Sequence, residues 1–244
     1  MSISRPPPRR SRTTDSLPQG TFEASRQSNT GVRPFRVYVI LLAAVTLLAA
    51  LPRPPLDEPD LPSLSTLLPH VEEVPQRPRV LGYERAEFGP GWASAGGCTV
   101  REQMLIDAGA TLSSCHVTAG TTRDPYTGHA LDLREGVEID HVFPLSAAWD
   151  LGAHRWSRAE REAFANDPRN LVVTSRAANQ EKSDQLPAAW MPSDGAARCW
   201  YARRLALVAA AHGLPLPVTD KVSVQAACRM DEVTRVWLGW SVDF

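Results

Sequence analysis

An uncharged run of fifteen residues, Val37 to Leu51, divides the chain into two unlike parts. Residues 1–34 precede it, and their arginine, proline and serine content without periodicity predicts a disordered segment. Residues 52–79 follow it, and their many prolines predict a linker. The remainder, residues 80–244, is long enough for one globular domain.

With Phe35 included, the run at 35–51 reaches the short end of the roughly 17 to 25 residues that span a bilayer. This predicts an N-terminal hydrophobic helix, either an uncleaved signal anchor or a signal peptide that is removed. A helix buried in a soluble core is the other interpretation. The arginine-rich flank keeps the N-terminus in the cytoplasm and sends the rest outward. We therefore expect the folded domain outside the cytoplasm, held at the cell membrane through this helix or secreted.

Charge is distributed unevenly along the chain. The formal net charge is −1, but residues 1–36 contain seven arginines and two acidic residues, a local charge of +5. The rest of the chain therefore sums to −6. A mildly acidic folded part argues against a protein that binds any polyanion through charge alone.

Four cysteines are spaced in a way that suits disulfides better than zinc ligands. Cys98 and Cys115 are 17 residues apart, Cys199 and Cys228 are 29 apart, and neither pair has the C-x-x-C spacing of a zinc site. An exported protein is expected to hold them as two disulfides. Of the three possible pairings we favour Cys98 with Cys115 and Cys199 with Cys228, because each closes a local pair of elements. Four free buried thiols are the alternative.

Helix and strand signals predict a mainly helical domain with short strands. Thr99 and Ser157 each precede a glutamate by three residues, the pattern of a capping box, and so predict helix starts. The string NLVVT at 170–174 is short and β-branched, which predicts a strand. Another extended run is expected to end at residue 141. Further helices are expected at about 144–152, 175–182, 196–211 and 220–236.

Polar residues lie at the end of one predicted strand, at the start of the next, and on the helix that follows. The stretch EIDHVFPLS places Asp140 and His141 at the end of an extended run. Asn170 opens the next strand, and Asn179 lies on the helix that follows, in the string NLVVTSRAANQEKSD. The order strand, strand, helix therefore carries a histidine, an asparagine and a second asparagine.

This ordered set resembles the HNH endonuclease motif, whose ββα-metal fold holds a divalent cation between a hairpin and a helix. The chain is most similar to secreted bacterial HNH proteins related to the C-terminal domain of GmrSD-type restriction enzymes, which share a DPYTG segment like Asp124 to Gly128 and an Asn-Gln-x-Lys-x-Asp string like Asn179 to Asp184. The resemblance covers residues 85–212. It implies an α+β fold, mainly helical around a small ββα-metal centre.

The chemistry of phosphodiester hydrolysis assigns a role to His141 and Asn170. A water must lose a proton near neutral pH, and the ordinary histidine pKa of about 6.5 suits His141 as general base. An imidazole acts reliably only when its ring is held in one orientation. Asn170 on the adjacent strand is expected to hold it; a simple turn residue after Asp167 and Pro168 is the other interpretation.

Charge that develops on the phosphate must also be stabilised, and a hard divalent cation bound by oxygen does so. Mg²⁺ is the expected metal, with Mn²⁺ as the alternative. The Asp140 carboxylate and the Asn179 amide oxygen are expected to bind it. In an extended strand Asp140 and His141 point to opposite faces, so Asp140 can face the metal while His141 faces the substrate.

Three neighbouring residues have two interpretations each. Glu138 points the same way as Asp140, so it either supports the metal site or faces solvent. Lys182 and Arg176 either contact phosphates or lie on a solvated helix face.

The sequence thus predicts a metal-dependent HNH endonuclease that acts on nucleic acid, DNA in preference to RNA, outside the cytoplasm. The alternative is a non-catalytic exported module that keeps the same scaffold to bind a partner. Intact Asp140, His141, Asn170 and Asn179 favour the enzyme.

Overall fold

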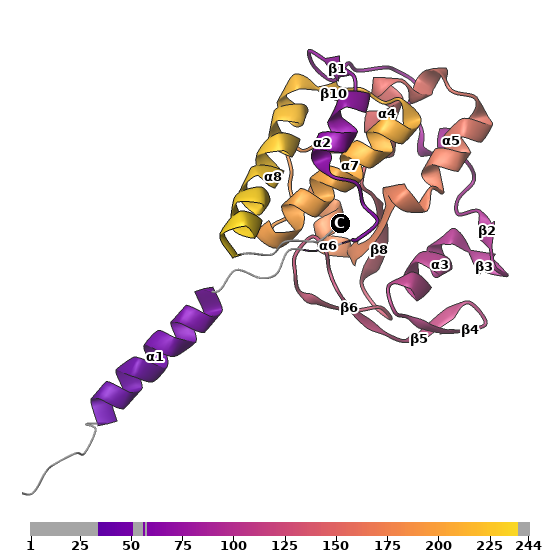
Figure 1. The fold of residues 1–244 in the computed structure, drawn as a ribbon. Helices are drawn as coiled ribbons and strands as arrows, with labels where there is room; N and C mark the ends of the chain where they lie inside the picture. Colours follow the sequence, from indigo (N-terminus) through magenta and orange to yellow (C-terminus); the bar gives the residue numbers. More distant parts are fainter. Residues whose placement is uncertain (1–33, 51–55, 57, 239–244) are drawn as a thin grey trace, which may run out of the picture. The chain divides into compact units, whose positions relative to one another are not determined.

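The computed structural model describes residues 34–50, 56 and 58–238, with side chains described for 34–47, 56 and 58–229 (Figure 1). The chain divides into two units, residues 1–51 and 52–244. Helix α1 (Pro34–Ala50) belongs to the first unit, and the segment predicted to be disordered, 1–34, otherwise lies outside the described residues. In the described ranges no helix is long and apolar enough to cross a membrane. The membrane anchor expected at 35–51 thus has no support from the structure.

The second unit combines helices with short strands, and helix predominates. Its α-helices are α2 (Leu64–Leu67), α3 (Val100–Asp107), α4 (Leu145–Leu151), α5 (Arg158–Ala165), α6 (Arg176–Lys182), α7 (Arg198–His212) and α8 (Val218–Leu238). Its strands are β1 (Glu73–Val74), β2 (Ser94–Ala95), β3 (Cys98–Thr99), β4 (Thr111–Ser113), β5 (His116–Ala119), β6 (Thr121–Arg123), β7 (Ala130–Asp132), β8 (Val137–His141), β9 (Leu171–Ser175) and β10 (Leu216–Pro217). They pair two by two: β1 runs parallel to β10, and the other pairs are antiparallel.

Local sequence signals set the ends of several helices as predicted. At the start of α5, Ser157 N donates to Glu160 Oε2 at 2.7 Å and Glu160 N donates to Ser157 Oγ at 3.3 Å, which confirms the capping box. The box at Thr99 likewise begins α3. Helix α7 ends before Gly213, whose φ of +61° is the left-handed conformation that glycine adopts without strain.

Two hydrophobic clusters form the core. The larger one surrounds α7, whose Tyr201, Leu205 and Val208 are fully buried, and α2 and α8 pack beside this helix (Figure 1). The smaller one lies between α3 and the antiparallel pair of β8 and β9, where Leu105 meets Ile139 and its neighbours. We call this pair the β8–β9 hairpin, although α4 and α5 lie between its two strands in the chain. The β8–β9 hairpin therefore has one face on an apolar cluster, which fixes its register.

The segment predicted as a linker, 52–79, is part of the core over its described residues, and this prediction was wrong there. Leu61, Leu64, Leu67 and Val71 are buried in the larger cluster, and β1 pairs with β10. The high proline content led to the linker assignment, although the segment also contains regularly spaced leucines that pack near α7. The boundary near residue 80 therefore does not separate a linker from a domain.

Both disulfides form with the predicted pairing. Cys199 on α7 joins Cys228 on α8, with 4.5 Å between their Cα atoms. Cys98 on β3 joins Cys115, which follows β4, with 5.6 Å between their Cα atoms. The first links the two long C-terminal helices, and the second ties the hairpins at the other end of the domain.

A compact strand, strand, helix unit lies at the centre of the domain. Strand β8 pairs antiparallel with β9 from Val137 opposite Ser175 to His141 opposite Leu171. Helix α6 begins directly after β9 and packs against both strands. Ser175 starts it by accepting a bond from Ala178 N.

Candidate active site

The hairpin places alternate residues of β8 on opposite faces. Val137 and Ile139 pack into the smaller apolar cluster, whereas Glu138 and Asp140 meet side chains of α6. His141, one residue further, is 6% exposed and lies against Trp92. The predicted opposition of Asp140 and His141 is therefore present at the strand end.

His141 is held in one orientation by a backbone carbonyl and an aromatic ring. Its Nε2 lies 2.9 Å from the carbonyl oxygen of Ala165, and its ring is parallel to that of Trp92, with an interplanar angle of 9° and centroids 5.8 Å apart. A carbonyl oxygen only accepts, so Nε2 carries a hydrogen, and in the neutral ring the lone pair lies on Nδ1. This tautomer leaves a basic nitrogen for a water molecule.

Burial keeps that imidazole neutral. Desolvation lowers the pKa of His141 from 6.5 to about 3, the bond to Ala165 opposes this shift, and the cations Arg85 and Lys182 add to it. The ordinary pKa expected from the sequence was therefore wrong for this environment. The ring is unprotonated throughout the neutral range.

Asn170 supports the loop after His141 instead of the ring itself. Its side chain is fully buried; Oδ1 accepts a bond from Phe143 N at 2.7 Å, and Nδ2 donates to Phe143 O at 3.2 Å. The backbone adds a bond from Val142 N to Asn170 O at 2.8 Å. The expected direct contact with the imidazole is thus replaced by a clamp on the backbone two residues beyond it.

Asp140 is nearly fully buried and already has two partners. Lys182 Nζ lies 3.1 Å from Oδ1 and 2.9 Å from Oδ2, and the Tyr126 hydroxyl donates to Oδ2 at 2.6 Å. Burial raises the pKa of Asp140, and attraction to Lys182 opposes that shift. Lys182 is fully buried and also donates to the His141 carbonyl oxygen at 2.8 Å. Both interpretations of Lys182 made from the sequence, phosphate contact or solvated face, were wrong.

Asn179, Glu138 and Arg176 form a second polar group beside Asp140. Asn179 Nδ2 donates to Glu138 Oε2 at 2.7 Å, and Arg176 Nε lies 3.1 Å from Glu138 Oε1. Because the nitrogen of the amide is used in this way, its oxygen is the atom that remains as an acceptor. Glu138 orients Asn179, and the exposed Arg176 side chain pairs with Glu138.

One polar cavity of about 410 Å³ brings three of the predicted residues together: Asp140, His141 and Asn179. Asp184, Arg79, Tyr83 and Arg85 also line it. Asn170 does not line this cavity, and it contacts the backbone of Phe143 instead. Arg79 was missed because residues 52–79 were assigned to a linker, and Tyr83 and Arg85 were missed because no local sequence pattern marks them as cavity residues.

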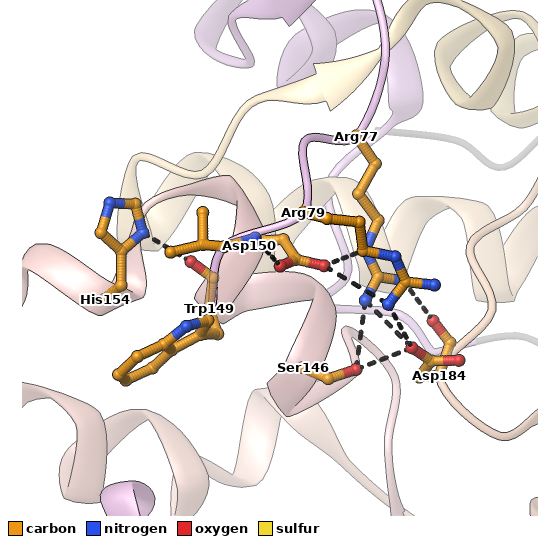
Figure 2. A network of polar contacts seen from close by, with 8 residues as sticks. Arg77, Arg79, Ser146, Trp149, Asp150, His154 and Asp184 are labelled. Atoms are coloured by element: carbon orange, nitrogen blue, oxygen red, sulfur yellow. Dashed lines mark hydrogen bonds and ion pairs between the residues drawn. The ribbon is translucent and has the colours of Figure 1, made fainter. Parts of the chain in front are cut away.

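The partly buried Arg77 explains how residues 77–85 reach this cavity. Arg77 donates to Asp150 at 2.7 Å, to the Asp184 carboxylate at 3.0 Å and to Ser146 at 3.2 Å, and Asp150 also accepts from Val80 N at 2.9 Å (Figure 2). These bonds fix the segment on α4 and on the residues after α6. Arg79 stays largely exposed beside Asp184, with 3.9 Å between the charged groups (Figure 2).

Two signals in the sequence pointed to Tyr126 and Lys182. Lys182 comes three residues after Asn179, which places both on one face of α6. Tyr126 belongs to the DPYTG segment, whose Asp124 is buried and accepts bonds from Tyr126 N, Thr174 and Ser175 N. That turn delivers the tyrosine hydroxyl to Asp140.

Metal ligands of the usual kinds are sparse. Among the described residues no group of three or more His, Cys, Asp and Glu is close enough to hold a metal ion. Asp140 and Asn179 are two oxygen donors on one cavity, and Mg²⁺ commonly uses only one or two protein ligands and keeps several waters. The donor types are therefore compatible with a divalent cation that keeps several waters, although both Asp140 oxygens already accept bonds from Lys182 or Tyr126.

Comparisons with known proteins agree with the sequence pattern. The family described as "GmrSD restriction endonucleases, C-terminal domain" matches residues 102–209, which include the whole hairpin and α6. The chain is 37% identical over 193 residues to a protein of Arthroderma benhamiae named "Uncharacterized secreted protein", covering 75% of this chain and 93% of the relative. No solved structure gives a significant match.

Substitution of Asn170 by alanine should lower the free energy of unfolding by about 2 to 6 kcal/mol, because two buried backbone groups lose their partners at about 1 to 3 kcal/mol each. Urea unfolding followed by tryptophan fluorescence measures the change. Gln180→Ala, on the exposed side of α6, is the control and should stay within about 0.5 kcal/mol of wild type. Equal effects of the two substitutions would contradict the clamp.

Proposed function

Because the chain belongs to the family of the GmrSD restriction endonuclease C-terminal domain, we propose that it is a metal-dependent HNH endonuclease that hydrolyses phosphodiester bonds of nucleic acid, DNA in preference to RNA. The observation that carries this proposal is the cavity shared by Asp140, His141 and Asn179 at the junction of the β8–β9 hairpin with α6. A neutral imidazole can act as the general base of phosphodiester hydrolysis, and a carboxylate and an amide oxygen can bind the metal.

His141 acts as the general base in this proposal. Its Nδ1 takes a proton from the attacking water, while Ala165 and Trp92 keep the ring from turning. Asn170 is a positioning residue, since its bonds to Phe143 hold the backbone that carries the imidazole. Arg79 and Arg85 on the cavity wall provide positive charge for the substrate phosphate.

Asp140 and Asn179 would hold the divalent cation, with Mg²⁺ expected and Mn²⁺ as the alternative. When bound, the metal stabilises negative charge on the phosphate and on the leaving oxygen. Glu138 orients the Asn179 amide, and Tyr126 and Lys182 orient the Asp140 carboxylate. Lys182 therefore serves as a positioning residue on the same carboxylate.

Export from the cytoplasm is supported by two observations. The two disulfides are typical of an oxidising compartment. The relative from Arthroderma benhamiae is named as a secreted protein. We propose that this chain is likewise secreted, with residues 35–51 as the export signal and the second unit as the nuclease.

One observation favours a second candidate, a non-catalytic exported module that uses the same scaffold to bind a partner. Both carboxylate oxygens of Asp140 are already bonded to Lys182 or Tyr126, so the carboxylate is satisfied without a metal. The experiments below separate the two candidates.

The purified protein should cut DNA, supplied both as supercoiled plasmid and as a labelled single strand, with Mg²⁺ or Mn²⁺ and not with EDTA. His141→Ala should lower the rate by about 10²- to 10⁴-fold, because the general base is lost. His129→Ala, an exposed histidine on the β6–β7 connection, is the matched control and should leave the rate unchanged. A protein that cuts neither substrate with either metal supports the binding module.

The pH profile should lack an acid limb near 6.5. Protonation inactivates the base, and because the pKa of His141 is lowered to about 3, the base remains free down to acidic pH. We expect kcat/KM at saturating metal to show no loss from this group between pH 7.5 and 5. A limb with a midpoint near 6.5 would show that His141 titrates as an exposed histidine.

Asn179→Ala should weaken Mn²⁺ binding by about 10- to 100-fold, because the amide oxygen is one of two protein ligands. Isothermal titration calorimetry measures this without any dependence on activity. Gln180→Ala, its exposed neighbour on α6, should bind Mn²⁺ as wild type does. Unchanged affinity in Asn179→Ala would remove this residue from the metal site.

A further inference from the structure

A second cavity adjoins the proposed active site on the other side of His141. Its volume is about 360 Å³, and the segment from Arg85 to Trp92 forms most of its wall. Arg85, His141 and Leu145 line both this cavity and the polar one. A ligand with one apolar and one anionic part can therefore lie across His141.

The walls of the second cavity are apolar apart from two residues. Besides Arg85 and His141 it is lined by alanine, glycine and proline together with Phe88, Trp92 and Leu145. Trp92 presents a large flat ring, parallel to the imidazole. Flat apolar surfaces of this kind stack on nucleobases, whatever the base.

Glycines shape the loop that closes the cavity. Gly89 has φ of +104°, and a Cβ there would lie 3.0 Å from Glu162 Cγ on α5, so only glycine fits without a shift. Gly91 has φ of +144° and open space where a side chain would stand. The bare backbone beside Trp92 leaves room for a planar group to enter.

Positive charge lies where the two cavities meet. Arg85 is exposed, and it forms no ion pair with any residue that the structure describes. Arg79 lines the polar cavity, with 79% of its side chain exposed. The Arg85 guanidinium group can therefore contact phosphate oxygens directly. That of Arg79 can do so by leaving its long ion pairs with Asp150 and Asp184, which measure 4.0 and 3.9 Å.

We infer that the site takes single-stranded nucleic acid, with a phosphate in the polar cavity beside Arg79 and Arg85 and the adjacent base stacked on Trp92 in the second cavity. This inference rests on the proposed function. A base in a duplex is paired and stacked between its neighbours, so it reaches such a cavity only by leaving the helix at an energetic cost. A strand that is already unpaired has no such cost.

Binding in EDTA tests this without cleavage. The full-length protein is titrated into a fluorescent single-stranded DNA oligonucleotide and into the duplex of the same sequence, and fluorescence anisotropy is measured. The single strand should bind at least about 10-fold more tightly. Trp92→Leu, which retains apolar packing but loses the ring, should weaken single-strand binding by about 5- to 150-fold, and Trp92→Phe should retain most of it.

Charge is tested in the same assay as a function of salt. Arg85→Gln should lower the slope of log affinity against log salt by about 0.7, the value for one phosphate contact on a single strand. Arg158→Gln, exposed at the start of α5 and outside both cavities, is the matched control and should leave the slope unchanged.

Equal binding of single strand and duplex, or wild-type affinity in Trp92→Leu, would overturn the inference. These results are distinct from a failure of the proposed function. Single-strand binding that depends on Trp92 without metal-dependent cleavage would retain this ligand site and remove the hydrolysis. Nicking of plasmid without preference for single strands would retain the hydrolysis and remove this site.

Discussion

The buried ammonium group of Lys182 is the interaction on which the rest of the site depends. Moving a lysine out of water costs several kcal/mol, and only good partners offset that cost. Here the two carboxylate oxygens of Asp140 and the carbonyl oxygen of His141 surround it at 2.8 to 3.1 Å. Because one residue of α6 bonds both neighbours at the end of β8, the helix and the strand end cannot move independently.

The same packing sets the chemistry of His141. The low dielectric that makes the ion pair strong also disfavours a second positive charge nearby. Burial and the neighbouring cations Lys182 and Arg85 therefore act in one direction on the imidazole, toward its neutral form. The ring is therefore neutral although two cations lie near it.

The sequence predicted features that depend on residues close together in the chain better than features that depend on contacts across the fold. The capping boxes at Thr99 and Ser157 were confirmed because they depend on residues three apart. The disulfide pairs and the strand, strand, helix order were also confirmed, because each could be read from the spacing and order of motifs along the chain. The roles of Asn170 and Lys182 could not be predicted, since they depend on which atoms approach across the fold. The docked segment before residue 80 was missed because proline content predicts extension in solution and says nothing of a partner surface. Arg79 was missed for the same reason, whereas Arg85 lies in the predicted domain and has no local pattern that marks it.

That docked segment also fixes the order in which the protein can assemble. Its partners come late in the chain: Glu58 accepts a bond from Trp200, β1 needs β10, and Arg77 needs Asp150 and Asp184. A nascent chain therefore makes residues 58–80 first, but their partners are complete only when about residue 217 has been synthesised. The segment from Arg85 to Trp92 packs on α5, so a chain that ends before α5 carries β8 and His141 without the wall that would receive a ligand.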